Sequence, residues 1–390
     1  MSNWCSPRVR RLPRGKPKQE IAVRSILLTL LLASLGQGAG KWELQYFYDK
    51  LDSQLVFQDL VFPSEQRGIA IGTLTEKGRE RPVVVLTGDG GRTWEMQRLR
   101  ETPISLFFLN DSLGWMVTEK GIWQTQEAGR DWKKLKGIRD IAEVFFTTPE
   151  HGWAIGGKKQ VLETHDGGRR WTGVAAAEIP KGNPKDSAYR CIDFATPQVG
   201  IIVGSSRPQR RDEPQLPEWI DPESGKRPEW PTLTLLLQTA DAGKSWQASN
   251  SSLFGTVTSL DLRRDGFGLA LFQFQGSFQY PAEVYRLDLH TGKSDRVFRQ
   301  KDRAVTDLVW IPGGSAYLGA IEPPGTLMHL PVPGRVRILS SDDLSKWSEM
   351  EVDYRATATG VILAAAGPDH VWAATDTGMI LKLNRKPAPQ

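Results

Sequence analysis

The sequence predicts an all-β fold, a seven-bladed β-propeller in which an N-terminal strand closes the last blade. Two repeated segments carry this prediction. One has the pattern Ser/Thr-x-Asp-x-Gly-x-x-Trp, and the other is an apolar strand, a short turn and a second apolar strand. No stretch of useful length has the periodicity of an amphipathic helix, so both repeats indicate small sheets packed face to face.

The first repeat is typical of a tight hairpin. Its Asp carboxylate can accept backbone N–H bonds inside the turn, and its Gly supplies a positive φ. We expect the Trp to open the next strand and to bury its ring between neighbouring sheets. The copies are TGDGGRTW (87–94), TQEAGRDW (125–132), THDGGRRW (164–171), TADAGKSW (239–246) and SSDDLSKW (340–347). A structural role is therefore predicted for Asp89, Trp94, Asp166, Trp171, Asp241, Trp246, Asp342 and Trp347.

The second repeat stands ahead of each hairpin and sets the number of blades. Its members are short, apolar or alternating, and bounded by Gly, Pro, Asn and Asp, as strands are. Each blade then has strands A and B around the short turn, strand C running into the hairpin, and strand D after it. The seven units begin at Leu60, Leu106, Val144, Ile192, Leu260, Leu308 and Ile362.

The ends of the chain supply the join that a closed ring needs. Blade seven runs from Val371 to Asn384 and stops without a hairpin or an outer strand. Near the other end, Trp42-Glu43-Leu44-Gln45 matches Trp94-Glu95-Met96-Gln97, the outer strand of blade one. We therefore expect residues 41–48 to provide the missing outer strand, which leaves only short, protected edges.

Residues 1–40 have the layout of an export leader. A basic segment precedes the uncharged apolar run Ile26–Leu35, and small residues follow it. A cleaved signal peptide and a retained N-terminal anchor are the two alternatives. Either predicts a periplasmic or extracellular body, which is membrane-associated if the anchor is retained. A lipoprotein signal is not expected, because no Cys stands just after the apolar run. The propeller is assigned to residues 41–385 and a short tail to 386–390.

Charge argues against a nucleic-acid partner. The chain has a net charge of +5. Residues 1–40 hold seven basic side chains and one acid, a net of +6, so the remaining residues sum to −1. Phosphate binding needs Lys and Arg gathered on the folded body, and the basic excess here belongs to the leader.

These repeats resemble the Asp-box propellers with sialidase-type repeats. In blade number, leader and repeats, residues 41–385 most resemble the photosystem II assembly and stability factor family. The resemblance implies an exported seven-bladed propeller that acts without a cofactor as a chaperone-like scaffold for a membrane complex. Two features depart from the pattern: the hairpins of blades five and six are not strict, and blade four carries a long insertion, residues 205–232.

The B–C loops are the predicted partner-binding surface. In a propeller they share one face, opposite the Asp hairpins, and here they carry many cations, which suit an acidic partner. The blade-four insertion adds Trp and Arg, residue types enriched at interaction hot spots. The candidate residues are Arg79, Arg81, Lys158, Lys159, Arg207, Arg210, Arg211, Trp219, Arg227 and Trp230. The alternative is a solvated surface loop whose own acids neutralise its cations.

A carbohydrate-active or sialidase-like glycoside hydrolase is the alternative function. Sialidases need an arginine triad and a Tyr–Glu pair, which the sequence does not match. Other glycosidases need two facing carboxylates, and loop-face acids do occur, at Glu76, Glu119, Asp212 and Glu322. Acids are common in loops, so we expect no enzyme and no catalytic residue.

No metal or cofactor is expected either. The five His residues lie far apart in sequence, and no His-x-x-x-His or Cys-x-x-Cys spacing occurs. His151 and His370 occupy equivalent A–B turns and are interpreted as surface turn residues. The two cysteines, Cys5 and Cys191, lie on either side of the leader's end, so no disulfide is expected within the mature chain.

Overall fold

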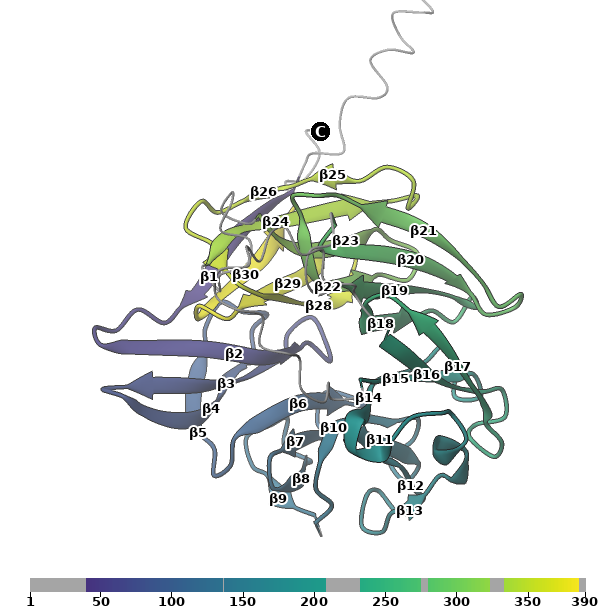
Figure 1. Ribbon diagram of the computed structural model, residues 1–390. Helices are drawn as coiled ribbons and strands as arrows, with labels where there is room; N and C mark the ends of the chain where they lie inside the picture. The colour runs from purple at the N-terminus through teal and green to yellow at the C-terminus, as the bar shows by residue number, and fades with distance from the viewer. Residues whose placement is uncertain (1–39, 136, 208–231, 275–279, 323–332, 386–390) are drawn as a thin grey trace, which may run out of the picture. The chain divides into compact units, whose positions relative to one another are not determined.

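The computed structural model describes residues 40–135, 137–207, 232–274, 280–322 and 333–385. Its compact unit is Gly40–Asn384, and Figure 1 shows its sheets arranged around a common centre. The leader, the C-terminal tail and most of the blade-four insertion lie outside the described residues.

Seven sheets make up this unit, which confirms the predicted blades. Blade one contains β2 (Ser53–Val61), β3 (Gly68–Glu76), β4 (Arg79–Thr87) and β5 (Glu95–Arg98). Blade two contains β6 (Pro103–Phe108), β7 (Gly114–Thr118), β8 (Gly121–Thr125) and β9 (Lys133–Lys134). Blade three contains β10 (Ile141–Phe146), β11 (Gly152–Gly156), β12 (Val161–Thr164) and β13 (Thr172–Gly173). Blade four contains β14 (Ser187–Phe194), β15 (Gly200–Ser206), β16 (Thr232–Thr239) and β17 (Gln247–Leu253).

The remaining blades follow the same order. Blade five contains β18 (Thr256–Leu262), β19 (Phe267–Gln273), β20 (Ala282–Asp288) and β21 (Lys293–Arg299). Blade six contains β22 (Ala304–Trp310), β23 (Ala316–Glu322), β24 (Gly334–Ser341) and β25 (Ser348–Glu349), and β27 (Thr357–Ala358) also pairs with β24. Blade seven contains β28 (Val361–Gly367), β29 (His370–Thr375) and β30 (Met379–Asn384). Two short 3₁₀ helices, η1 (Ala175–Glu178) and η2 (Pro184–Asp186), precede blade four.

The innermost strands form a closed ring. Each first strand contacts the first strand of the next blade, in the order β2, β6, β10, β14, β18, β22 and β28, and β28 contacts β2. Neighbouring blades therefore pack against each other through their innermost strands.

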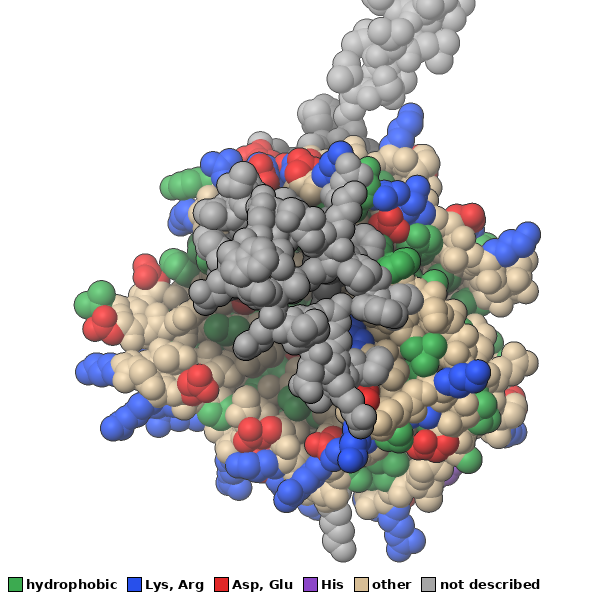
Figure 2. Space-filling model, in the orientation of Figure 1, with side chains coloured by type: hydrophobic (Ala, Val, Ile, Leu, Met, Phe, Trp, Pro, Cys, Tyr) green, Lys and Arg blue, Asp and Glu red, His purple; other side chains and the backbone are tan. Residues whose placement is uncertain are grey.

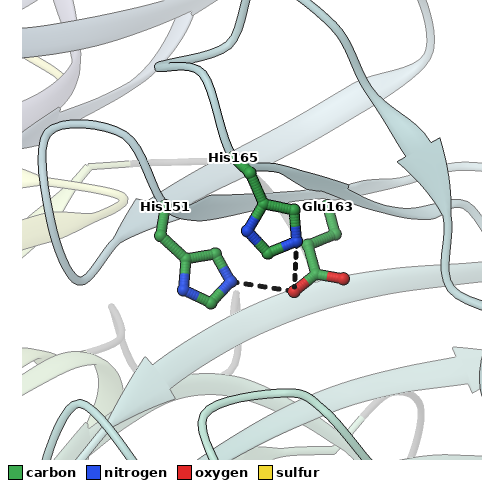
Figure 3. A group of neighbouring side chains, drawn as sticks. All are labelled: His151, Glu163 and His165. Carbon is green, nitrogen blue, oxygen red and sulfur yellow. Dashed lines mark hydrogen bonds and ion pairs between the residues drawn. The ribbon is translucent and has the colours of Figure 1, made fainter.

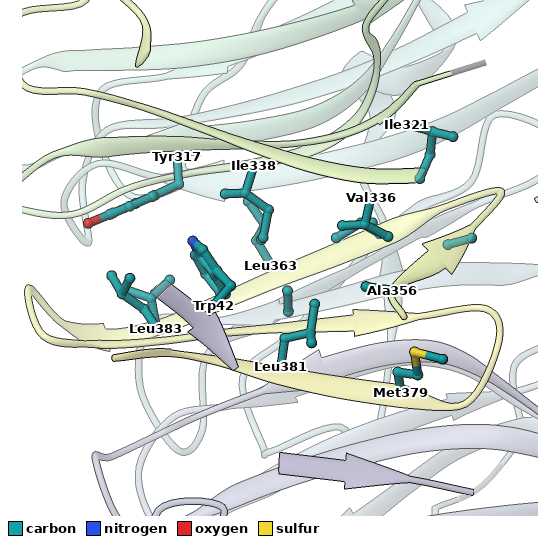
Figure 4. Close-up of a cluster of buried hydrophobic side chains, with 14 of the residues drawn as sticks. Trp42, Tyr317, Ile321, Val336, Ile338, Ala356, Leu363, Met379, Leu381 and Leu383 are labelled. Atoms are coloured by element: carbon teal, nitrogen blue, oxygen red, sulfur yellow. The ribbon is translucent and has the colours of Figure 1, made fainter. Parts of the chain in front are cut away.

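The N-terminal strand closes this ring as predicted. Strand β1 (Lys41–Phe47) pairs antiparallel with β30, from Lys41 opposite Asn384 to Phe47 opposite Met379. Its other edge pairs in parallel with β26 (Glu351–Val352). The fully buried Trp42 packs edge-on against Tyr317 of blade six, with ring centroids 6.2 Å apart, inside the cluster drawn in Figure 4.

Stacked aromatic rings join several blades. Trp115 stacks on Phe146 at 3.6 Å, and Trp372 on Phe62 at 3.5 Å, each pair crossing from one blade to the next. The hairpin Trp94 meets Phe62 edge-on at 6.0 Å. The hairpin tryptophans are only half-buried, so the fully buried wedges between blades are the tryptophans on the second strands instead.

Within the part of the chain that the structure describes, no helix has the length and hydrophobicity needed to cross a membrane.

Candidate functional site

The Asp carboxylates of the hairpins accept hydrogen bonds from their own turns. Asp89 accepts the backbone N–H groups of Arg92 and Thr93 at 2.9 Å each. The Thr93 hydroxyl and these N–H groups lower the pKa of Asp89 to about 2. Asp166 and Asp241 accept hydrogen bonds in the same way. A carboxylate that caps its own turn is satisfied there, and this arrangement leaves it no catalytic task.

In blade six, Asp343 takes this role, which corrects the expectation for Asp342. Asp343 accepts the N–H groups of Ser345 and Lys346 at 2.8 and 3.0 Å, whereas Asp342 accepts only the Ser315 hydroxyl. The turn has one left-handed residue, Leu344 at φ 61°, where the strict hairpins have two. The shorter turn moves the capping position by one residue.

The cations expected on the B–C face differ in their availability. Arg79 is exposed at the β3–β4 hairpin. Arg81 pairs with Glu76 at 2.9 Å, and Lys158 pairs with Asp140 at 2.6 Å. Arg207 donates to the Thr232 hydroxyl at 3.3 Å and also to Thr256.

Lys159 is not part of an accessible surface. Its side chain is 3% exposed, and its ammonium donates to the carbonyl oxygens of Glu178 and Pro180 at 3.0 and 2.9 Å. It therefore anchors the segment around η1, and its assignment to a partner surface was wrong. The other candidates, Arg210, Arg211, Trp219, Arg227 and Trp230, lie outside the described residues.

The surface charge is mixed. Figure 2 shows Lys and Arg side chains interspersed with Asp and Glu over the visible face. Among the loop acids considered for glycoside hydrolysis, Glu76 lies beside Arg81, Glu119 beside Lys120 and Glu322 beside Arg337, and Asp212 lies outside the described residues. Each described acid is thus paired with a cation rather than facing a second carboxylate.

Two clefts lie along the seam between blades one and two, and the sequence did not predict them. Their volumes are about 310 and about 200 Å³, and Arg130 lines both. Arg67 lines the first, and Arg98 and Arg100 line the second. Among the described residues, these four guanidinium groups have no hydrogen-bond or ion-pair partner.

Acids also line these clefts, but two of them are already engaged. Asp89 caps its hairpin, and Glu101 accepts from Thr118 at 2.7 Å and Trp123 at 2.9 Å and pairs with Lys134. The other two acids that line the clefts are Glu95 and Asp131. The seam therefore offers more uncommitted positive than negative charge. No sequence pattern could show this, because the arginines come from different blades.

Five carboxylates lie on the inner ring of strands. Each comes from the innermost strand of a different blade and is partly exposed although protein surrounds it: Asp59, Glu143, Asp193, Asp261 and Asp307. Desolvation raises the pKa of each. It brings the pKa of Asp59 and Asp193 to about 6, and that of Asp261, with nearby Asp193 contributing, to about 7.

These carboxylates bind the backbone of the next blade. The distances from the donating N–H nitrogen to the carboxylate oxygen are 2.7 Å for Leu106 to Asp59, 2.6 Å for Leu262 to Asp193, 2.6 Å for Trp310 to Asp261 and 2.8 Å for Leu363 to Asp307. Shifted carboxylates often mark an active site, but here each joins two blades. Acids within apolar strands, as in LVFQDLVF, were the sequence signal for them.

The structure also brings two histidines together with a glutamate. His151 and His165 both direct Nε2 at one oxygen of Glu163 (Figure 3). From the sequence, His151 was interpreted as a surface turn residue, and its grouping with Glu163 and His165 was not predicted. The signal was Glu163-x-His165 at the end of an expected strand, because residues two apart in an extended segment share a face.

The chain has relatives of known function in its sequence. A family model described as photosynthesis system II assembly factor YCF48 matches residues 138–208. The chain resembles the photosystem II assembly factors. The photosystem II assembly protein Ycf48 of a Synechococcus strain is 25% identical over 242 residues, 57% of this chain and 66% of that protein, just under two thirds of its length. A photosystem II assembly lipoprotein Ycf48 from Nostoc is 26% identical over 63% of this chain and 70% of its own.

Solved structures match the fold over nearly the whole chain. A structure of YCF48 bound to D1 peptide has a TM-score of 0.58 at 15% identity, covering 89% of this chain and 97% of that one. YCF48 from Cyanidioschyzon merolae has a TM-score of 0.56 at 12% identity, covering 88% and 98%. The propeller domain of the trilobed protease from Pyrococcus furiosus has a TM-score of 0.53 at 10% identity, covering 86% and 97%. Since a protease domain shares the fold, the fold alone does not decide the function.

Proposed function

We propose that this chain is a non-catalytic exported propeller that binds a protein partner and assists the assembly of a membrane complex. The observation that carries the proposal is the sequence similarity to photosystem II assembly proteins, 25% over 242 residues for the Synechococcus protein. The partner that this similarity suggests is a subunit of a photosystem II-like complex, such as D1, whose peptide is bound in one of the similar structures.

The cleft between blades one and two is the described surface that best suits such a partner. Arg98 and Arg100 on the blade-one side face the cleft with Arg130 from blade two. Arginine presents five N–H donors in a planar fork that matches a carboxylate. We therefore expect an acidic segment of the partner to lie along this seam.

The exported location rests on the leader and on the relatives. Two relatives, from Nostoc and Prochlorococcus marinus, are named lipoproteins. Here no Cys stands just after the apolar run Ile26–Leu35. We propose that this chain reaches the same side of the membrane through a cleaved signal peptide or an uncleaved apolar anchor, without a lipid.

A hydrolase is less well supported. The described loop acids are paired with cations, and the carboxylates with raised pKa values hold neighbouring blades together. A glycosidase needs two carboxylates that are free to face a substrate.

The test is direct binding of labelled peptides that together cover D1, measured by fluorescence anisotropy with the full chain. We expect one peptide to bind saturably. In the double variant Arg98→Glu and Arg130→Glu, affinity should fall at least about tenfold, because each lost charged contact is worth roughly 1.5–3 kcal/mol. The control variant, Arg264→Glu with Lys293→Glu, reverses two exposed cations on blade five and should bind like the parent. If no peptide binds, the D1-type partner is wrong; if both variants weaken binding equally, the seam is not the site.

A further inference from the structure

We propose that His151, Glu163 and His165 form a binding site for a divalent transition-metal ion of the zinc class on blade three. This site is independent of the proposed partner surface. It also departs from the expectation that the chain binds no metal, because strand pairing assembles ligands that are not close in sequence.

Two neighbouring strands position the three side chains. His151 ends the A–B turn just before β11, and Glu163 and His165 flank Thr164 at the end of β12. In the antiparallel pairing, Trp153 lies opposite Glu163 and Gly152 lies opposite Thr164. This register brings His151 beside Glu163 and His165. The imidazole rings of His151 and His165 stack with centroids 4.5 Å apart.

The donor atoms converge on one point. Nε2 of His151 lies 2.8 Å from Oε1 of Glu163, and Nε2 of His165 lies 3.5 Å from the same oxygen. All three ligand atoms lie within 4.8 Å of one another. A tetrahedral ion with bonds of about 2.0–2.1 Å spaces its donors by roughly 3.3 Å, so only small side-chain movements are needed to enclose one (Figure 3).

The ligand set and its burial suit zinc with one open position. Two imidazole nitrogens and one carboxylate oxygen are the three protein ligands of many zinc sites, where water takes the fourth place. Side chains of His151 and Glu163 are 20% and 19% exposed, while that of His165 is 68% exposed. Two ligands are thus held in place, and the third leaves a path for the ion.

The fold does not require these residues. In the hairpins of blades one, two and four, other residues stand at the positions of Glu163 and His165. These residues are Leu86 and Gly88, Gln124 and Gln126, and Gln238 and Ala240. Each hairpin forms without a ligand at these positions. The equivalent turn of blade seven holds only part of such a site. There, His370 lies 3.2 Å from Glu65, and no second histidine among the described residues joins them.

The experiment is a zinc titration of the full chain, made without a histidine tag and stripped with chelator, followed by calorimetry near neutral pH. We expect one ion to bind per chain. Replacing His165 with Ala, or Glu163 with Gln, should weaken zinc binding at least about tenfold, because each removes one of three ligands. His370→Ala is the matched control and should leave the affinity unchanged.

A second readout uses Trp153, whose ring lies 4.3 Å from that of His151. Copper binds nitrogen ligands more tightly than zinc does, and it should quench this tryptophan in the parent but much less in the His165→Ala variant. Circular dichroism would confirm that the variants are folded. Absence of saturable zinc binding, or equal binding by the parent and the His165→Ala and Glu163→Gln variants, would overturn the proposal.

Discussion

At the scale of single residues, the carboxylates of the innermost strands join the blades at an electrostatic cost. Asp261 accepts the N–H of Trp310 from the next blade at 2.6 Å, yet desolvation and the neighbouring Asp193 disfavour its charge. The folded state therefore binds more protons than the unfolded chain between the ordinary carboxyl pKa of about 4 and the raised values. Stability from these groups is complete at low pH and is lost as the pH rises through about 6 to 7.

Asp261→Asn tests this sign. The amide oxygen can still accept the Trp310 N–H, while the charge is removed. The free energy of unfolding at about pH 8 should rise by roughly 1–3 kcal/mol, and the decline between about pH 5 and 8 should become shallower, because one pKa unit corresponds to 1.36 kcal/mol. Urea unfolding at several pH values measures both. Asp111→Asn, at an exposed site, should change neither, and an unchanged slope in the Asp261 variant would contradict the assignment.

The blade-six turn gives a second residue-scale prediction. Asp343 accepts two backbone N–H groups and the Ser345 hydroxyl, whereas Asp342 accepts one hydroxyl. Asp343→Ala should lower the free energy of unfolding, because it removes the carboxylate that caps two backbone N–H groups of the turn. Asp342→Ala should lower it less, because this change removes one hydroxyl partner and no backbone cap. The reverse order in thermal or urea unfolding would show that Asp342 is the cap.

At the scale of elements, the blade seams depend on aromatic contacts that the sequence revealed only in part. The hairpin repeat shows that Trp94 and its counterparts exist, because their spacing from Asp and Gly recurs. It does not show which tryptophan is most deeply buried. That depends on how one blade meets the next, and Trp372 is fully buried against Phe62 of blade one.

A pair of truncations compares the two kinds of tryptophan around one phenylalanine. Trp372→Ala should cost about 3–5 kcal/mol, the usual range for a fully buried aromatic. Trp94→Ala should cost less, because its ring is half-buried and meets Phe62 only edge-on. Equilibrium unfolding of the two variants decides the order, and a larger loss for Trp94 would reverse our assignment of the wedges.

At the scale of the whole molecule, stability depends on closing the ring. Strand β1 joins residues from opposite ends of the chain, with Lys41 opposite Asn384, and its Trp42 is fully buried. Without this strand, blade seven would expose the edge of β30. An unpaired edge favours association with other chains.

Two truncated chains test the closure. A chain starting at residue 41 retains β1, and a chain starting at residue 48 lacks it. We expect the second chain to unfold at a lower temperature and to aggregate, while the first keeps one cooperative transition. Differential scanning calorimetry with light scattering compares them, and equal behaviour would show that β1 does not close the ring.

Seven blades, the closing strand and most hairpins were predictable because each recurs as a pattern in the sequence. The proposed binding surfaces were not predictable in this way. The arginine-lined clefts combine residues from two blades, and the group around Glu163 depends on strand register. Lys159 matched the expected basic surface by position alone, but its burial beneath η1 could not be seen without the packing.

The most direct test of the central claim is quantitative capture of membrane proteins by the full chain from solubilised membranes of its source cells. The account predicts that subunits of one membrane complex are enriched. Their recovery should fall with the Arg98→Glu and Arg130→Glu double variant and persist with the Arg264→Glu and Lys293→Glu control. Equal recovery with all three baits, or enrichment of no membrane subunit, would contradict the claim that this propeller assists assembly through the seam between blades one and two.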